Sequence, residues 1–557
     1  MRTHTFLARW LPVALASTAL GCGALLGLDG QHAVECMADD GCEPSQICHA
    51  NRCEAAPCDD GLKNGTETDV DCGGSSKSCS RCVDSKPCGA GSDCLGGVCT
   101  SVNTCCTPPC PLWSEQFGDG SDQSASAVTT DIHGNIVIAG NFGGELNFGG
   151  PPLYSAGFED AYLAKLDSKG HALWSKRFGD VAYDYASVVA AGPTGEVVVA
   201  GRFTGSVDFG DGNALTNAGG AAGYDLFIVK FDADGKLLWR KQFGGAQTDV
   251  RGLVIDVNAD IVLTGFFNGT IDLGGDKLKN SGDPLGDDIF VAKLDGNGGH
   301  VWSSSYGDGD LQESAGVALD PEGNVVLVGR FGGVVDFGGS SLPLVSAGNL
   351  DVFVVKLSSS GKTLWSKRFG GFQSQEGGGV VTGADGSIVV TGRFQSLLEL
   401  GGGVPDLSAM GKDMDVFLVK LDAAGHHLWS TELGTASQDT AYSVAMDPQG
   451  RVVVAGLFGS GTIVQSCGEL TSYGESDRRD VFMAEFDGEG QCTWNRGFAT
   501  GSLEKLDLYP HVALDLVGDL ILVGGFQREV SFGLEKLVPM GDQMNKDPDA
   551  FVVKFAR

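Results

Sequence analysis

Positive charge is scarce in this chain of 557 residues. Lys and Arg total 38 against 71 Asp and Glu, which gives a formal net charge of −33. A protein that binds nucleic acid needs a basic face for the phosphates, so this balance argues against a nucleic-acid partner. The surplus of acidic residues is typical of a well-solvated surface and by itself names no ligand.

Cysteine is almost absent from most of the chain. Only Cys467 and Cys492 lie beyond residue 110, whereas fourteen cysteines fall between Cys36 and Cys110. Aliphatic residues are few in that stretch, so disulfides must hold it together, in an oxidising compartment. Zinc is the alternative at "CSRC" (79–82), but structural zinc needs a second ligand pair and usually a reducing compartment. The fourteen cysteines, whose connectivity stays open, are Cys36, Cys42, Cys48, Cys53, Cys58, Cys72, Cys79, Cys82, Cys88, Cys94, Cys99, Cys105, Cys106 and Cys110.

Familiar catalytic motifs are missing as well. The sequence has no Gly-x-Ser-x-Gly elbow, phosphate-binding loop or His-Glu-x-x-His. Histidine is rare, and beyond residue 110 it falls in separate predicted turns and one late strand, with no sign of convergence. We therefore predict neither enzyme activity, nor a cofactor, nor a metal site, with "GDGD" (307–310) as a weak hint of calcium. These histidines are His133, His171, His300, His426, His427 and His511.

The N-terminus has the layout of a secretory signal. Arg2 and Arg9 precede an apolar stretch that leads to Cys22, which predicts a signal peptide over 1–21. The segment "ALGC" (19–22) resembles a bacterial lipobox, except that Ala stands where Leu is usual. This resemblance implies lipidation of Cys22 and an outer-membrane or cell-surface location. Two alternatives stay open: cleavage after "ALA" (14–16) with secretion, or a transmembrane anchor over Trp10–Leu28.

Three signals recur seven times beyond residue 110. One is a Trp, spaced at intervals of 61 to 65 residues; another is an apolar run that ends in Gly-x-Phe; the third is an Asp that opens an alternating strand such as "DVFVVKL" (351–357). Asp or Pro followed by Gly lies between the segments, as expected for hairpin turns. The tryptophans, which we predict to have structural roles in the units, are Trp113, Trp174, Trp239, Trp302, Trp365, Trp429 and Trp494.

Each unit is predicted to be a four-stranded antiparallel blade. The apolar run is continuous, so both of its faces should be buried. A separate all-β domain of about 64 residues would be only marginally stable, which favours units that pack on one another. The sequence therefore predicts an all-β, seven-bladed β-propeller over 111–557. The array begins with a Trp strand (111–117) and ends with an Asp strand (549–555), so the first strand should join the last blade and close the ring.

The repeats resemble a bacterial seven-bladed β-propeller repeat family through "KLD-x-x-G-x-x-LW" and "D-x-x-G-N-x-V-x-x-G-x-F". The resemblance covers 111–557 and implies the fold and an exported setting, without catalytic residues. The stretch "NGTETDVDCGG" (64–74) resembles a cysteine-rich module of surface proteins from myxobacteria and related bacteria, which implies an extracellular spacer or interaction module. The turn "D-x-x-G-x-x-LW" is also similar to the tryptophan-docking motif of quinoprotein propellers, where it is structural.

Together these features predict a signal peptide (1–21), a linker (22–35), a disulfide module (36–110) and a propeller (111–557). We expect an exported, lipid-anchored, monomeric surface protein that presents the propeller as a scaffold for an extracellular protein or glycan. An extracellular lyase or hydrolase acting on a polymer, or a purely structural envelope protein, are the alternatives. Ligand-binding residues are expected first in the loops 216–224 and 464–480. Cys467 and Cys492 should form a disulfide within the sixth unit.

Overall fold

The computed structural model describes residues 46–49, 52–55, 98–99, 105–106 and 108–557, the last range without 219–222, 245, 283–285, 341, 473–478, 503–508 and 541–546. The chain divides into two compact units, Met1–Cys110 and Pro111–Arg557. In the first unit, two short antiparallel pairs are described, and Cys106 forms a disulfide with Cys110. These pairs are β1 (Gln46–His49) with β2 (Arg52–Ala55) and β3 (Val98–Cys99) with β4 (Cys105–Cys106).

Most predictions for the N-terminal unit lie outside the described residues. These are the signal peptide (1–21), lipidation at Cys22, the alternative anchor Trp10–Leu28 and the linker (22–35). The same holds for the pairing of the cysteines before Cys106: Cys36, Cys42, Cys58, Cys72, Cys79, Cys82, Cys88 and Cys94 are not described, and Cys48, Cys53, Cys99 and Cys105 are described in their backbone alone.

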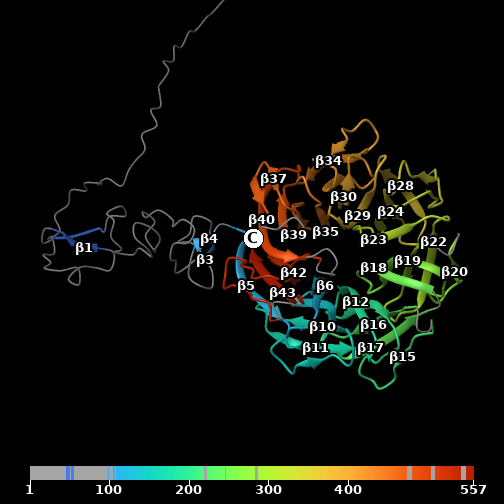
Figure 1. Cartoon of the computed structure of the whole chain (residues 1–557), viewed down its shortest axis with the longest axis horizontal. Coiled ribbons are helices and arrows are strands. Elements are labelled where there is room, and N and C mark those ends of the chain that lie inside the picture. Colours follow the sequence, from blue (N-terminus) through green and yellow to red (C-terminus); the bar gives the residue numbers. More distant parts are fainter. Residues whose placement is uncertain are drawn as a thin grey trace, which may run out of the picture. The chain divides into compact units, whose positions relative to one another are not determined.

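The second unit is a closed ring of seven four-stranded antiparallel blades (Figure 1). This arrangement confirms the predicted fold. No helix occurs in the described part of the chain, and none of the residues described there forms a helix that could cross a membrane.

Within each blade the strands are ordered from the centre of the ring outward. The first strands line the centre and are β6 (Gln123–Thr130), β12 (Asp184–Ala191), β18 (Ala246–Ile255), β23 (Gln312–Leu319), β29 (Gln375–Thr382), β35 (Thr440–Met446) and β41 (His511–Leu514). The second strands are the apolar runs β7 (Ile136–Phe142), β13 (Val197–Phe203), β19 (Ile261–Ile271), β24 (Val325–Phe331), β30 (Ile388–Gln395), β36 (Val452–Phe458) and β42 (Leu520–Phe526).

The third and fourth strands complete each blade toward the rim. The third strands, which carry the repeated Asp, are β10 (Asp160–Leu166), β16 (Asp225–Phe231), β21 (Asp288–Leu294), β27 (Asp351–Leu357), β33 (Met414–Leu421), β39 (Arg479–Phe486) and β43 (Asp549–Ala556). The fourth strands carry the Trp residues and are β11 (Ala172–Phe178), β17 (Leu237–Phe243), β22 (His300–Tyr306), β28 (Thr363–Phe369), β34 (His427–Leu433), β40 (Cys492–Ser502) and β5 (Cys110–Phe117).

Short strands decorate the loops between the second and third strands. They are β8 (Glu145–Leu146), β9 (Leu153–Tyr154), β14 (Ser206–Val207), β15 (Leu215–Thr216), β20 (Leu278–Lys279), β25 (Val334–Val335), β26 (Leu344–Val345), β31 (Leu397–Leu398), β32 (Leu407–Ser408), β37 (Thr462–Gln465) and β38 (Gly468–Thr471). Cys467, between β37 and β38, forms a disulfide with Cys492 at the start of β40, with an S–S distance of 2.02 Å. The disulfide therefore ties this loop to the outer strand of its own blade.

The hydrophobic core consists of layers between neighbouring blades. Leu163 of the first blade and Val199 of the second belong to one buried cluster. Ile138 of the first blade and Val523 of the seventh belong to another, so the packing continues between the first and last blades. Burial on both faces of the second strands is what a continuous apolar run predicts, because each strand is covered by both adjacent blades.

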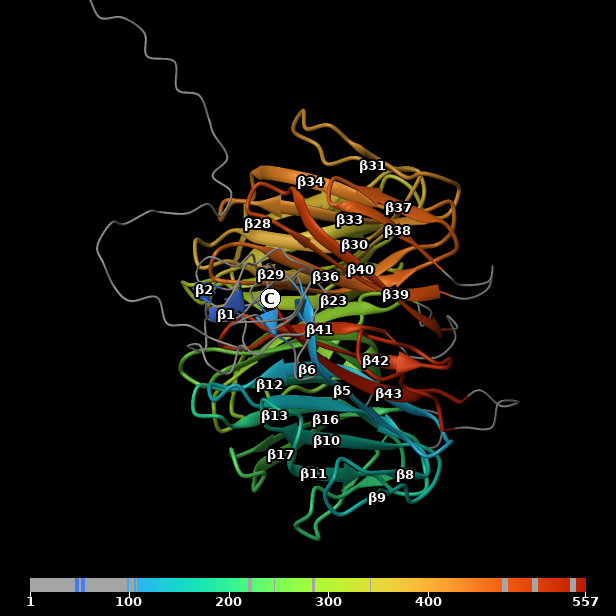
Figure 2. The ribbon, with the colours of Figure 1, turned by 90° about the vertical axis from the view of Figure 1, so that its left-hand side faces the viewer.

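The ring closes as predicted, since β5 is the outermost strand of the seventh blade beside β43. Figures 1 and 2 show β5 (blue) lying next to β43 (red), although the two strands are more than 400 residues apart. The closing strand covers an edge of β43 that would otherwise offer unpaired backbone groups.

In six of the seven blades, the indole N–H of the outer-strand Trp donates a hydrogen bond to the next blade. The Trp174 indole N–H donates to the Ala233 carbonyl at 3.1 Å, and a Cβ built on Gly235 would lie 2.9 Å from the same ring. Trp113 of β5 makes the equivalent bond to the Ser168 carbonyl of the first blade, at 3.2 Å. The other indoles with this contact are Trp239, Trp302, Trp365 and Trp429, bonded to Gly296, Ser359, Ala423 and Gly488.

A buried Lys supports the same junctions. Lys165 lies 2.8 Å from the Asp131 carboxylate and donates to the Ala233 carbonyl of the next blade at 3.1 Å. Lys230, Lys293, Lys356 and Lys554 pair in the same way with Glu196, Asp256, Asp320 and Asp515. The sixth blade differs: Glu485 stands at the Lys position, and Arg557 supplies the positive charge by pairing with Glu485 and Asp447.

Candidate functional site

The centre of the ring is a channel with a cavity of about 620 Å³, lined by residues from the first strands of all seven blades. In six blades a β-bulge interrupts the first strand, and the bulged residue lies in the channel wall. Because a bulge turns one side chain out of the regular alternation, it exposes that residue to the lumen. The bulged residues are Ser126, Ser187, Arg251, Ala315, Gly378 and Tyr442.

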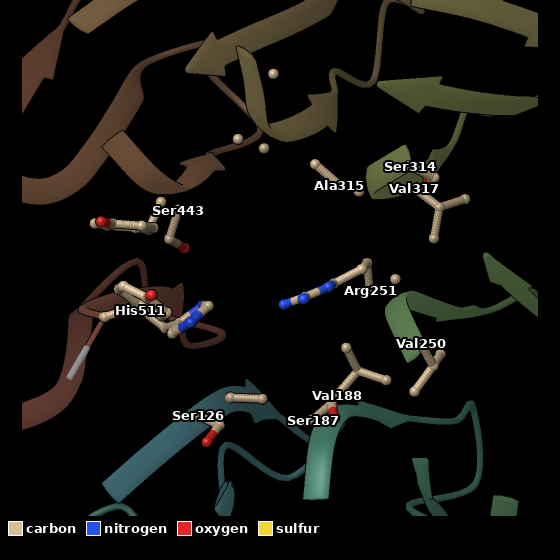
Figure 3. Close-up of a pocket in the computed structure, with 18 of the residues that line it drawn as sticks. Ser126, Ser187, Val188, Val250, Arg251, Ser314, Ala315, Val317, Ser443 and His511 are labelled. Atoms are coloured by element: carbon tan, nitrogen blue, oxygen red, sulfur yellow. The ribbon is translucent and has the colours of Figure 1, made fainter. Parts of the chain in front are cut away.

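Arg251 is the charged member of this set. Figure 3 shows its guanidinium extending from β18 into the channel, toward the side where His511 lies. Its Nη2 lies 3.1 Å from the Asp249 carboxylate, and its guanidinium carbon lies 5.4 Å from the centre of the Phe266 ring. The side chain is nevertheless 48% exposed. Asp249 and Phe266 thus orient a cation that still faces the cavity.

Paired charges from blades 2 to 5 line the channel beside Arg251. The Asp249 carboxylate also forms an ion pair with Arg202 of the preceding blade, with Oδ2 3.0 Å from Nη1. Arg330 contacts Glu313 of its own blade at 2.8 Å and Glu376 of the next blade at 2.6 Å. We call the seven groups the charged belt: Arg202, Asp249, Arg251, Glu313, Arg330, Glu376 and Arg393. Four arginines and three carboxylates give the belt a formal charge of +1, in a chain whose net charge is −33.

Aromatic rings extend from the belt to the surface of the propeller. Phe158 and Tyr183 stack at 4.8 Å with 9° between their planes, and Tyr183 and Tyr185 stack at 6.1 Å with 5° between theirs. Arg202 lies over Tyr185 at 5.0 Å and over Tyr224 at 4.7 Å. We call Phe158, Tyr183, Tyr185 and Tyr224 the aromatic ladder. It runs from an exposed ring, Phe158, to one that lines the cavity, Tyr185.

The opposite wall of the channel is formed by the sixth and seventh blades. Tyr442 and Tyr509 stack at 4.3 Å, and His511 lies next to them in the lining. Burial lowers the pKa of His511 to about 4, so this imidazole is neutral near pH 7. The positive charge in the channel therefore comes from the arginines.

The repeated Asp residues of the third strands cap backbone amides. Asp160 accepts a hydrogen bond from the Ala156 N–H at 2.9 Å, and Asp351 accepts one from the Ala347 N–H at 2.8 Å. In the "GDGD" stretch, Asp308 accepts bonds from the Asp310 and Val334 amides. Among the residues described, no group of three or more His, Cys, Asp and Glu side chains could hold a metal ion.

The sequence located the framework better than the site. All seven tryptophans of the repeats lie in the outer strands, and none of them lines the channel. Of the two loops expected to bind ligand, 216–224 contributes Tyr224 to the aromatic ladder, whereas parts of both loops lie outside the described residues. His300 and His427, expected in turns, are instead the first residues of β22 and β34.

The charged belt was not predicted, although the sequence carries a signal for it. The variable residue of Gly-x-Phe is Arg in three of the seven units, the second, fourth and fifth, at Arg202, Arg330 and Arg393. The acidic partners Glu313 and Glu376 lie directly opposite Arg330 and Arg393 on the paired first strands. Comparing this one position across the seven units would have pointed to the channel.

Two buried carboxyls, in the second and sixth blades, make stability depend on pH. Burial raises the pKa of Asp184 to about 8, with Asp180 and Asp160 adding to the effect, and burial raises that of Asp439 to about 7. The folded state therefore holds protons that the unfolded state releases above pH 4, so this stabilisation is present at low pH and is lost as pH rises through 7 to 8.

We expect Asp184→Asn to remove about 2 kcal/mol of the stability lost between pH 6.5 and pH 9. Gln312 and Gln375 occupy the equivalent position in other blades, so an amide fits there. Urea unfolding at both pH values measures the effect, with Asp208→Asn on the exposed rim as the control. An equal pH dependence in Asp184→Asn and the parent protein would contradict the prediction.

The chain was compared with protein families and with known proteins. No family model matches the chain. It is 22% identical over 503 residues to an uncharacterized WD repeat-containing protein of Acanthamoeba polyphaga mimivirus, covering 63% of this chain and 36% of that protein. The chain thus spans about a third of that relative's length.

Two solved structures illustrate the similarity. A polysaccharide lyase described as an ulvan lyase has a TM-score of 0.39 and 10% identity, over 77% of this chain and 96% of the lyase. Sqt1 from Chaetomium thermophilum has a TM-score of 0.36 and 10% identity, over 80% of this chain and all of Sqt1. The chain is a seven-bladed β-propeller. Likenesses at this level transfer no activity to it.

Proposed function

We propose that this chain is an exported, lipid-anchored surface protein that presents its β-propeller as a binding scaffold. The observation that carries the binding role is a contrast between framework and channel. The docked Trp, the buried Lys and the capping Asp recur in nearly every blade, whereas the bulged residues in the channel wall differ from blade to blade. A ring that served only as architecture has no need for such variety at one position.

Rigidity supports the same role. The inter-blade Trp and Lys contacts and the closing strand β5 fix the ring, so the channel residues are held in place before any ligand arrives. Preorganised side chains lose little conformational entropy on binding, which favours affinity. An extracellular protein or a glycan, bound by a monomeric propeller, fits this arrangement.

Export is supported by the sequence and by cysteine chemistry. The charged and then apolar N-terminus leads to Cys22, and the repeats resemble an exported bacterial propeller family. The disulfides Cys106–Cys110 and Cys467–Cys492 favour an oxidising compartment. Lipid on Cys22 would then attach the chain to the outer membrane or cell surface, with the cysteine-rich segment preceding the propeller.

Labelling with radioactive palmitate in a Gram-negative host tests the anchor. The full chain should incorporate label, Cys22→Ser should lose it, and Cys36→Ser, a nearby cysteine expected in a disulfide, should keep it. Label retained in Cys22→Ser, or a mature N-terminus at residue 17, would contradict the lipid anchor. Screening the full chain against glycans and secreted proteins tests the scaffold; turnover of a polymer would instead favour a lyase or hydrolase.

A further inference from the structure

We propose that the channel beside blades 1 to 3 binds an acidic carbohydrate. Arg251 holds a carboxylate of the ligand, and the exposed end of the aromatic ladder, Phe158 and Tyr183, provides the surface on which a sugar ring stacks. This inference deepens the proposed scaffold role, on which it rests, by naming the ligand class and the residues that recognise it.

The positive charge of Arg251 favours an acidic ligand. Asp249 is shared between two guanidinium groups, those of Arg202 at 3.0 Å and Arg251 at 3.1 Å. Arg251 therefore shares Asp249 with a second cation, and nearly half of its side chain is exposed in the lining of the cavity. A guanidinium presents donors in a planar fork that matches a second carboxylate. An anionic group on a ligand would complete the pairing.

The exposed aromatic rings of the ladder favour a ligand that can stack on them. Phe158 is 63% exposed and Tyr183 is 39% exposed, although both are large apolar rings on a well-solvated protein. Their planes are nearly parallel to each other and to that of Tyr185, so the rings form one continuous series. The series ends at Arg202, beside the cavity. Flat ring faces that lead to a cation suit a ligand with flat apolar faces and a negative charge.

Hydroxyl groups in the channel wall favour an acidic sugar over other ligands that carry a carboxylate. Ser126 and Ser187 are bulged residues of the first two blades, and their hydroxyls make no hydrogen bond to any residue that the structure describes. They can donate to and accept from the hydroxyls of a carbohydrate. The cavity of about 620 Å³ lies within the ~300–1,000 Å³ typical of small-ligand sites. It has room for a short oligosaccharide.

Calorimetry with the full chain tests the proposal. The probes are trigalacturonate, trimannuronate and a hyaluronan tetrasaccharide, each compared with its carboxyl-reduced neutral form. At least one acidic probe should bind at least tenfold more tightly than its neutral form. Arg251→Gln should weaken that binding by about tenfold to a hundredfold, because a charge-assisted hydrogen bond is lost. Arg240→Gln, a change of the same kind on the outer strand β17, should leave it unchanged.

A second pair of variants tests the stacking platform. Phe158→Ala should weaken the same binding by fivefold or more, whereas Phe372→Ala, which removes another strongly exposed Phe from the loop between β28 and β29, should not. Both rings are on the surface, so both variants should fold, and thermal unfolding checks this. The pair keeps the proposal testable even if Arg251→Gln does not fold.

Several results would overturn the proposal. These are no binding of any acidic probe at 1 mM, equal binding of acidic and neutral forms, equal binding of poly-glutamate, or binding that survives Arg251→Gln and Phe158→Ala. The failure is distinguishable from that of the proposed function: palmitate on Cys22 and a different ligand in the wider screen would leave the anchored scaffold in place and remove only the carbohydrate site.

Discussion

Deleting residues 111–118 from the full chain should unfold the propeller at room temperature or leave it barely stable. The deleted strand β5 carries Phe117, which is buried, and Trp113, which docks on Ser168 of the first blade. Burial of one Phe accounts for about 3–5 kcal/mol, and loss of the strand would also expose the edge of β43. The total rivals the 5–15 kcal/mol that holds a typical domain folded.

Cleavage of the chain gives the matched test for this closing strand. A protease site placed in the loop after residue 118 should leave the fragment 1–118 bound to the ring under native conditions, because β5 is a strand of the seventh blade. A site placed in the predicted linker 22–35, ahead of the first cysteine of the disulfide module, should release its fragment. The cut after 118 should separate the pieces only in denaturant, as gel filtration can show. Release of 1–118 from a folded ring, or an unchanged urea midpoint in the deletion, would mean that β5 is dispensable.

The framework could be predicted from the sequence because every blade places the same residue types in the same surroundings. A Trp spaced every 61 to 65 residues marks an outer strand in each unit. The order of the segments alone then required the strand at 111–117 to join the blade that ends at 555. Seven repetitions of one pattern provide the redundancy that a single motif lacks.

The channel could not be predicted in the same way, because a β-bulge breaks the alternation on which sequence patterns depend. A strict period of two would place Asp249, Arg251 and Leu253 on one face of β18. In the structure the register shifts between Val250 and Gly252, so Leu253 is buried while Arg251 stands in the lumen. No residue type in the sequence marks the bulge, since its position is Ser, Arg, Ala, Gly or Tyr in different blades.

Replacing Arg557 should cause the second large loss of stability. This residue supplies the positive charge in the sixth blade, where Glu485 stands in place of the usual Lys. Arg557 is 5% exposed at its side chain and pairs with Glu485 and Asp447, whose side chains are 5% and 2% exposed. Arg557→Ala would leave Glu485 without its cation in a buried site. We expect a loss of about 3–5 kcal/mol, because an unpaired buried charge is far costlier than a surface one. Urea unfolding of the full chain measures it.

A charge exchange makes this expectation specific. Lys at position 485 would restore the pattern of the other blades, where Lys165 and Lys356 pair with Asp131 and Asp320 at 2.8 and 2.7 Å. Glu485→Lys should therefore destabilise the parent protein, where it faces Arg557, yet recover most of the stability lost in Arg557→Ala. The resulting coupling should reach about 2–3 kcal/mol in a double-mutant cycle.

Arg451→Ala is the control for this cycle, since Arg451 pairs with the same Asp447 but is 42% exposed. Exposed pairs contribute about 0–1 kcal/mol, so this variant should change little. Additive effects of Glu485→Lys and Arg557→Ala would mean that the two residues act independently. Strong coupling would instead show that Arg557 performs, between the sixth and seventh blades, the task that a Lys of the third strand performs elsewhere in the ring.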